Sequence, residues 1–173
     1  VLEVVNFYLR PETDQDEFSA ALAFGAELGA RHVLTMGDDP EWNRQVDAFG
    51  RFCDRIAQFG MTAAVEYAIS RPIATLDDTV RLINAAGRTN GVVCLDPLNH
   101  ARGSGGADLL DAVDARLLPY AQITDGVVGP GEPDLARAKA NGPNVRRWPG
   151  EGDVPLAQYL DRLPLDIALS VEG

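Results

Sequence analysis

Short apolar runs alternate along the whole chain with stretches whose apolar residues recur at helical spacing. Capping signals mark several boundaries, such as Asp14 before one stretch and Gly29 after it, or Thr75 followed by Asp78. The helical stretches are 14–30, 40–60, 75–87, 106–117 and 154–163, and a Gly/Pro-rich loop covers 126–150. The apolar runs are "VLEVVNFYL" (1–9), "HVLTMG" (32–37), "MTAAVEYA" (61–68), "GVVCLDP" (91–97), "YAQITD" (120–125) and "LDIALSVE" (165–172).

The apolar runs are continuous rather than alternating, which is typical of strands buried on both faces of a parallel sheet. A length of 173 residues suits one domain with a substantial core. Two α/β architectures fit, an open doubly wound sheet and a (β/α)8 TIM barrel. No G-x-G-x-x-G follows the first run and no G-x-x-x-x-G-K-[ST] occurs, so the nucleotide-binding folds lose support.

Polar side chains end four of the predicted strands: Glu66, Asp96, Gln122 and Glu172. In a barrel the carboxyl ends of all strands meet at one face, so these side chains would converge. Three crowded carboxylates need a compensating charge, and oxygen ligands suit Mg²⁺ or Mn²⁺. The alternative reading is that the four residues are unrelated helix caps and loop starters.

The charge balance narrows the classes of partner. The chain has 26 acidic and 15 basic side chains, a formal charge of −11, which argues against a nucleic-acid surface. No apolar run approaches the roughly 18 residues of a membrane span, and no leader is visible. Cys53 and Cys94 lack CxxC spacing and are predicted to be free thiols, consistent with a cytoplasmic protein. His32 is expected to be a surface or capping residue, and the sequence leaves a homo-oligomer open.

Several motifs together resemble those of the xylose isomerase-like TIM barrels, the sugar phosphate isomerase/epimerase superfamily: "AAVEYA", "CLDPLNHARGSGGADLL", "YAQITDG", "RRWPGEGDVPLAQYLDRL" and "ALSVEG". The superfamily also holds inosose and dehydroshikimate dehydratases and endonuclease IV-type AP endonucleases. The resemblance implies that residues 1–173 are one domain, a partial barrel holding strands three to eight. We expect strands one and two and the last helix to be missing from a full chain of roughly 250 residues.

The resemblance also implies a site. Glu66, Asp96, Gln122 and Glu172 match the ligands of one divalent metal ion, which could be Mn, Mg, Co or Zn. Arg147 matches a residue that contacts substrate oxygens, and Arg102 is a further anion contact. Family members commonly carry His where this chain has Asn99, followed here by His100. We therefore expect either Asn99 or a shifted His100 to contact the substrate.

The function implied is that of an isomerase or epimerase acting on a small sugar, sugar phosphate or polyol-derived substrate. Glu66 and Glu172 would serve as acid and base in proton abstraction next to a carbonyl, giving a metal-stabilised enediolate. The alternative is a metal-dependent dehydratase, a lyase of a cyclic hydroxyketone such as an inosose or dehydroshikimate. DNA repair is disfavoured, because those enzymes need several more His ligands than His32 and His100 supply.

Overall fold

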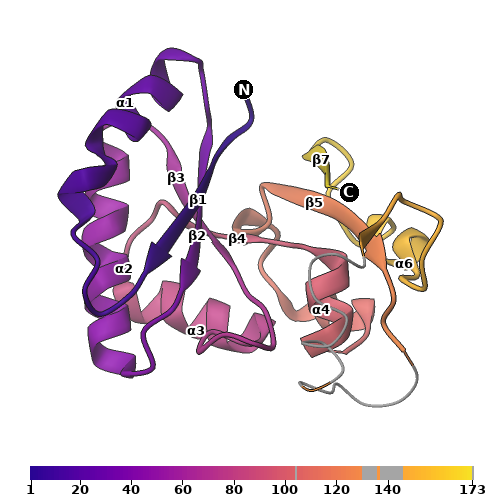
Figure 1. The fold of residues 1–173 in the computed structure, drawn as a ribbon. Helices are drawn as coiled ribbons and strands as arrows, with labels where there is room; N and C mark the ends of the chain where they lie inside the picture. Colours follow the sequence, from indigo (N-terminus) through magenta and orange to yellow (C-terminus); the bar gives the residue numbers. More distant parts are fainter. Residues whose placement is uncertain (104, 130–135, 137–145, 173) are drawn as a thin grey trace.

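The computed structural model describes residues 1–103, 105–129, 136 and 146–172 (Figure 1). Four parallel strands form the first sheet in chain order: β1 (Glu3–Leu9), β2 (His32–Gly37), β3 (Thr62–Glu66) and β4 (Gly91–Cys94). The second sheet has the order β6-β5-β7, built from β5 (Tyr120–Gly126), β6 (Arg146–Arg147) and β7 (Ala168–Glu172). β5 and β7 are parallel, whereas β6 runs antiparallel to β5.

An isolated parallel bridge between Leu95 and Ala121 pairs the two sheets. The strands β1, β2, β3, β4, β5 and β7 therefore follow one another side by side in sequence order, which is the strand order of a TIM barrel. The predicted partial barrel is confirmed. Because these strands are parallel, their carboxyl ends, which carry the predicted site residues, share one face of the molecule.

Helices connect the strands and cover the outside of the first sheet, with α1 and α2 lying along the same side in Figure 1. The predicted caps are present: the Asp14 side chain accepts a hydrogen bond from the backbone N–H of Asp16, and Thr75 caps α3. Gly29 ends the α1 region in the left-handed conformation that favours glycine. The helices are η1 (Gln15–Phe18), α1 (Ser19–Glu27), α2 (Trp42–Ala57), α3 (Leu76–Ala86), α4 (Pro97–Gly103), η2 (Ala107–Ala112), η3 (Ala115–Leu117) and α6 (Leu156–Leu160).

The main core lies between the first sheet and helices α1 to α3. Phe49, Phe52 and Ile56 of α2 are fully buried there, and the ring of Phe52 lies 5.9 Å from that of Phe7. No helix within the described residues is long and apolar enough to cross a membrane.

Three segments after β4 bear on the structure expected from the sequence. The single helix predicted over 106–117 is wrong, because this segment forms two short 3-10 helices, whose period of three resembles the helical period over so few residues. The segment after β4 forms a helix, Pro97–Gly103, that the apolar pattern does not show. Much of the predicted 126–150 loop lies outside the described residues, and its described end contains the short strand β6.

Candidate active site at the carboxyl ends of the strands

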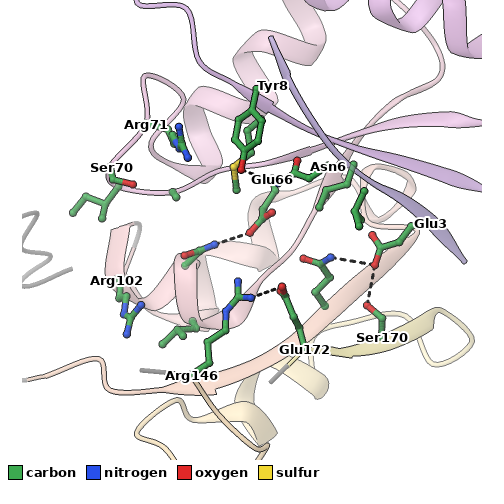
Figure 2. A pocket seen from close by; sticks show the side chains of 18 of the residues that line it. Glu3, Asn6, Tyr8, Glu66, Ser70, Arg71, Arg102, Arg146, Ser170 and Glu172 are labelled. Atoms are coloured by element: carbon green, nitrogen blue, oxygen red, sulfur yellow. Dashed lines mark hydrogen bonds and ion pairs between the residues drawn. The ribbon is translucent and has the colours of Figure 1, made fainter. Parts of the chain in front are cut away.

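A cavity of about 660 Å³ opens where the strands end, and Figure 2 shows its lining side chains. Five of the residues predicted for the site line it: Glu66, Asn99, Arg102, Gln122 and Glu172. They come from β3, from α4, and from β5 and β7. Convergence of side chains from separate strands favours a built site over unrelated caps.

Asp96 lies beneath the cavity and is only 1% exposed. Asn99 connects it to Glu66, because its Nδ2 donates to Glu66 Oε1 at 2.7 Å and lies 3.4 Å from Asp96 Oδ2. The backbone N–H of Asn99 also donates to Asp96 Oδ1 at 2.9 Å. Asn99 therefore lies between two of the predicted metal ligands.

Arg146, rather than Arg147, faces the cavity. Its guanidinium forms an ion pair with Glu172 and lies 3.7 Å from Asp96 Oδ2 (Figure 2). Arg147 is exposed and does not line the cavity. Neighbouring side chains of a strand point to opposite faces, so only one of the two arginines in β6 can point inward.

The crowded carboxylates affect one another. Burial, together with the charges of Asp96 and Glu172, raises the pKa of Glu66 to about 8, against the opposing effects of Arg146 and Asn99. Burial also raises the pKa of Asp96, although the Asn99 N–H and Arg146 oppose the shift. A further positive charge in the cavity would relieve this excess of negative charge.

The two remaining substrate-contact candidates on α4 have different surroundings. His100 is fully buried, bonds Tyr67 Oη at 2.7 Å and the Gly106 carbonyl at 3.0 Å, and does not line the cavity. Arg102 lines the cavity, is 8% exposed, and donates through Nε and Nη2 to the Val127 carbonyl. Of the alternatives Asn99 and His100, the structure brings Asn99 to the cavity.

Gln122 is 4% exposed, and the two ends of its side-chain amide differ in their hydrogen bonding. Its Nε2 donates to Glu3 Oε1 at 3.1 Å, whereas its Oε1 is buried with no hydrogen-bond partner among the described residues. An unpaired buried carbonyl oxygen is uncommon in folded proteins. A carbonyl oxygen is also a type of ligand that hard divalent cations bind.

Sequence reasoning missed several cavity residues. Asn6 and Tyr8 reach it from β1, and Ser70 and Arg71 from the loop after β3. Arg71 also donates to Asp38 at 3.0 Å, and its guanidinium lies over the Tyr8 ring. Polar residues inside the apolar run 1–9 were the available signal, because a buried strand seldom carries them without a partner.

A tight turn after β6 is held by one carboxylate. Asp125 Oδ1 accepts from the N–H groups of Gly126 and Val154, and Oδ2 from those of Gly150 and Gly152, at 2.7 to 3.1 Å. Burial raises the pKa of Asp125, but these four donors outweigh it and hold the pKa below its usual range. A side chain at 152 would overlap with the Asp125 carboxylate. Since Asp125 also pairs with Arg147 in the β5–β6 register, the turn fixes the placement of Arg146.

The donor set suits a divalent metal ion in kind. Glu66, Asp96, Glu172 and the unpaired Gln122 oxygen are all hard oxygen donors. Within the described residues, however, no three His, Cys, Asp or Glu side chains are already grouped as an ion site. The Arg146 guanidinium lies among these carboxylates, paired with Glu172 and 3.7 Å from Asp96 Oδ2.

Residues 4–170 match the family model of the xylose isomerase-like TIM barrel, so the chain belongs to this family. No curated protein matches it in sequence.

Three solved structures illustrate the likeness in fold. An IolI protein with a bound zinc atom gives a TM-score of 0.78 and 19% identity, over 99% of this chain and 66% of that one. The probable 3-DHS dehydratase AsbF from Bacillus anthracis gives 0.78 and 16%, over 100% and 70%. An L-ribulose 3-epimerase gives 0.68 and 19%, over 91% and 53%. The chain thus spans about two thirds of the first of these proteins, and at such identities the likeness concerns the fold alone.

Proposed function

We propose that this protein is a divalent-metal-dependent isomerase or epimerase acting on a small sugar or sugar phosphate. The observation that carries the proposal is the convergence of Glu66 and Glu172, from β3 and β7, on one cavity that also holds an unpaired amide oxygen. The zinc atom of the IolI structure and the epimerase among the similar folds support the same reading.

The residues that would hold the ion are Glu66, Asp96, Glu172 and, through its carbonyl oxygen, Gln122. A bound divalent ion supplies a Lewis acid that polarises a nearby carbonyl. Glu172 and Glu66 reach the cavity from different strands, so one carboxylate can remove a proton beside the carbonyl while the other returns a proton on the opposite side. Asn99 and Arg146 line the same space and can position substrate oxygens.

The first test is the metal content after dialysis, measured by elemental analysis. We expect near-stoichiometric divalent metal in the unaltered protein and its loss in a Glu66→Ala/Glu172→Ala variant. A Glu12→Ala/Glu151→Ala variant is the matched control, because it removes the same charge from two exposed positions and should keep the metal. A protein that binds no metal, even with added Mn²⁺, would overturn the proposal.

The second test is turnover. With a panel of ketoses and ketose phosphates in deuterated water, the product should carry deuterium at the carbon next to the carbonyl. Glu172→Gln should abolish this incorporation while retaining much of the metal, since the amide oxygen remains a ligand but cannot accept the proton. Unchanged incorporation in Glu172→Gln would remove Glu172 from the acid–base pair.

A second candidate function is dehydration of a cyclic hydroxyketone that carries a carboxylate. Arg102 favours it, because this guanidinium is buried beside the cavity and no ion pair to it occurs within the described residues. A buried guanidinium that lines a cavity is suited to an anionic substrate group. Dehydration creates a conjugated product that absorbs ultraviolet light, whereas epimerisation does not. An ultraviolet-monitored assay with dehydroshikimate, which carries a carboxylate, therefore separates the two candidates, and inosose, which has no carboxylate, is the comparison substrate.

A further inference from the structure

The orientation of the Gln122 amide is set by its neighbour Glu3. Three donors converge on the Glu3 carboxylate: Gln122 Nε2 at 3.1 Å, Tyr120 Oη at 2.9 Å and Ser170 Oγ at 3.3 Å. Figure 2 shows Glu3 and Ser170 side by side at the edge of the cavity. An ionised carboxylate can only accept hydrogen bonds, so the amide must present its NH₂ group to Glu3.

The reversed amide is disfavoured because it would put the carbonyl oxygen of Gln122 against the Glu3 carboxylate. In the orientation present, the carbonyl oxygen is the end left without a partner, and Gln122 lines the same cavity as Glu66 and Glu172. A buried acceptor left unpaired has a free-energy cost, because it has lost its hydrogen bonds to water. A ligand that accepts electron density at this point would remove the cost.

We propose that Glu3 is a positioning residue that holds the Gln122 amide with its carbonyl oxygen available to a divalent cation. The inference rests on the proposed function, because it takes Gln122 as one of the cation ligands. An amide nitrogen carries no free lone pair for a cation, so a reversed amide would remove one ligand. Partners in the outer shell of a metal site typically contribute roughly tenfold to a hundredfold in metal affinity.

Binding of Mn²⁺ alone, measured by calorimetry and by electron paramagnetic resonance of the free ion, tests this without a substrate. Four proteins are compared: the unaltered chain, Glu3→Gln, Gln122→Glu, and the double variant. In the Gln122 background, Glu3→Gln should weaken Mn²⁺ binding at least tenfold, because a neutral amide at position 3 tolerates either orientation. In the Gln122→Glu background both ends of residue 122 are oxygens, so Glu3→Gln should leave binding unchanged or strengthen it by removing a repulsion.

The comparison between the two backgrounds distinguishes an effect on the orientation of the Gln122 amide from an effect of the Glu3 charge. If the negative charge of Glu3 merely attracts the cation, Glu3→Gln weakens binding by the same factor in both backgrounds, and the proposal falls. Glu3→Asp is a second test of the same distinction, and it replaces Glu3→Gln if that variant does not fold. It keeps the charge but withdraws the carboxylate by one methylene, so it should weaken Mn²⁺ binding in the Gln122 background only.

Ser170→Ala is the matched control, since it removes another donor to Glu3 and leaves the Gln122 contact in place. Its Mn²⁺ affinity should stay within about threefold of the unaltered chain, and circular dichroism confirms folding of every variant. An unaltered chain that binds no Mn²⁺ overturns the proposed function, and this inference with it. An unaltered chain that binds Mn²⁺, with no loss in Glu3→Gln and Glu3→Asp, overturns the role of Glu3 alone.

Discussion

The two sheets of this barrel differ in how firmly they are built. The first sheet has continuous pairing from β1 to β4, and helices α1 to α3 cover it with fully buried side chains such as Phe49 and Phe52. Within the described residues the backbone pairing between the second sheet and the first is the isolated Leu95–Ala121 bridge, and the α6 helix has only five residues. Leu165 and Val171 of this second region are exposed.

The candidate site draws on both regions. Glu66 comes from β3 of the first sheet, Asp96 and Asn99 come from the segment after β4, and Gln122 and Glu172 come from the second sheet. Regions with few buried apolar contacts open at lower free-energy cost than packed ones. The comparison therefore implies that Glu172, on the partly exposed strand β7, is held less rigidly than Glu66, on the buried strand β3.

The largest expected effect is on the packing of the first region. Phe52→Ala removes a fully buried ring that contacts Phe7 and Phe18, and should lower the free energy of unfolding by about 3–5 kcal/mol. Leu165→Ala, at an exposed position of the second region, should stay within about 0.5 kcal/mol. Urea denaturation measures both, and equal losses would show that the two regions do not differ as described.

A smaller effect is expected where the second region is held by hydrogen bonds. In Asp125→Asn the new NH₂ group would face backbone N–H donors, so the free energy of unfolding should fall by about 2–3 kcal/mol. Hydrogen exchange at Gly150, Gly152 and Val154 should also speed up. Asp153→Asn makes the same change at an exposed position of the same turn and should have little effect. Equal losses in the two variants would contradict the role assigned to Asp125.

The smallest effect concerns His32, at the amino end of β2. It is 6% exposed, stacks on Tyr120 and bonds Thr62 Oγ1, so the expectation of a surface residue is wrong. Burial, with a contribution from Arg31, lowers the pKa of His32 to about 4.

The unfolded chain takes up this proton below about pH 6.5, whereas the folded chain resists it until about pH 4. Stability from His32 is therefore present above pH 6.5 and is lost as the pH falls through that window. Its share of the loss between pH 7 and pH 5.5 should be about 1 kcal/mol. In His32→Gln this share should be missing, whereas the shares of His100, whose pKa burial lowers, and of Glu66, whose pKa burial raises, should remain. An unchanged pH dependence of urea denaturation would contradict this account.

Continuous apolar runs and caps such as Thr75 were sufficient to predict the strands, because they are local signals, whereas the choice of a barrel over an open sheet came from the family resemblance. The sequence also predicted that Glu66, Gln122 and Glu172 share a cavity, since strand ends meet in any parallel barrel. It did not show which of two adjacent arginines points inward, because that depends on the β5–β6 register.

The contacts that β1 makes with the site could also not be predicted from local sequence patterns. Glu3 contacts Tyr120 and Gln122 across more than a hundred residues of sequence, and nothing near Glu3 in the chain indicates those partners. His100 shows the same limit, because a histidine beside a strand end fits a substrate contact as well as the buried contact to Tyr67 that the structure contains.

The Asp125 turn has a consequence for how the surface that follows Arg146 can change during evolution. Its shape is encoded by one carboxylate, by backbone N–H groups and by the absence of a side chain at Gly152. The side chains of Trp148 and Glu151 are exposed and take no part in that encoding. Substitutions at these two positions should therefore leave the placement of Arg146 unchanged. New surface chemistry can arise at these two positions while the turn that places Arg146 keeps its shape.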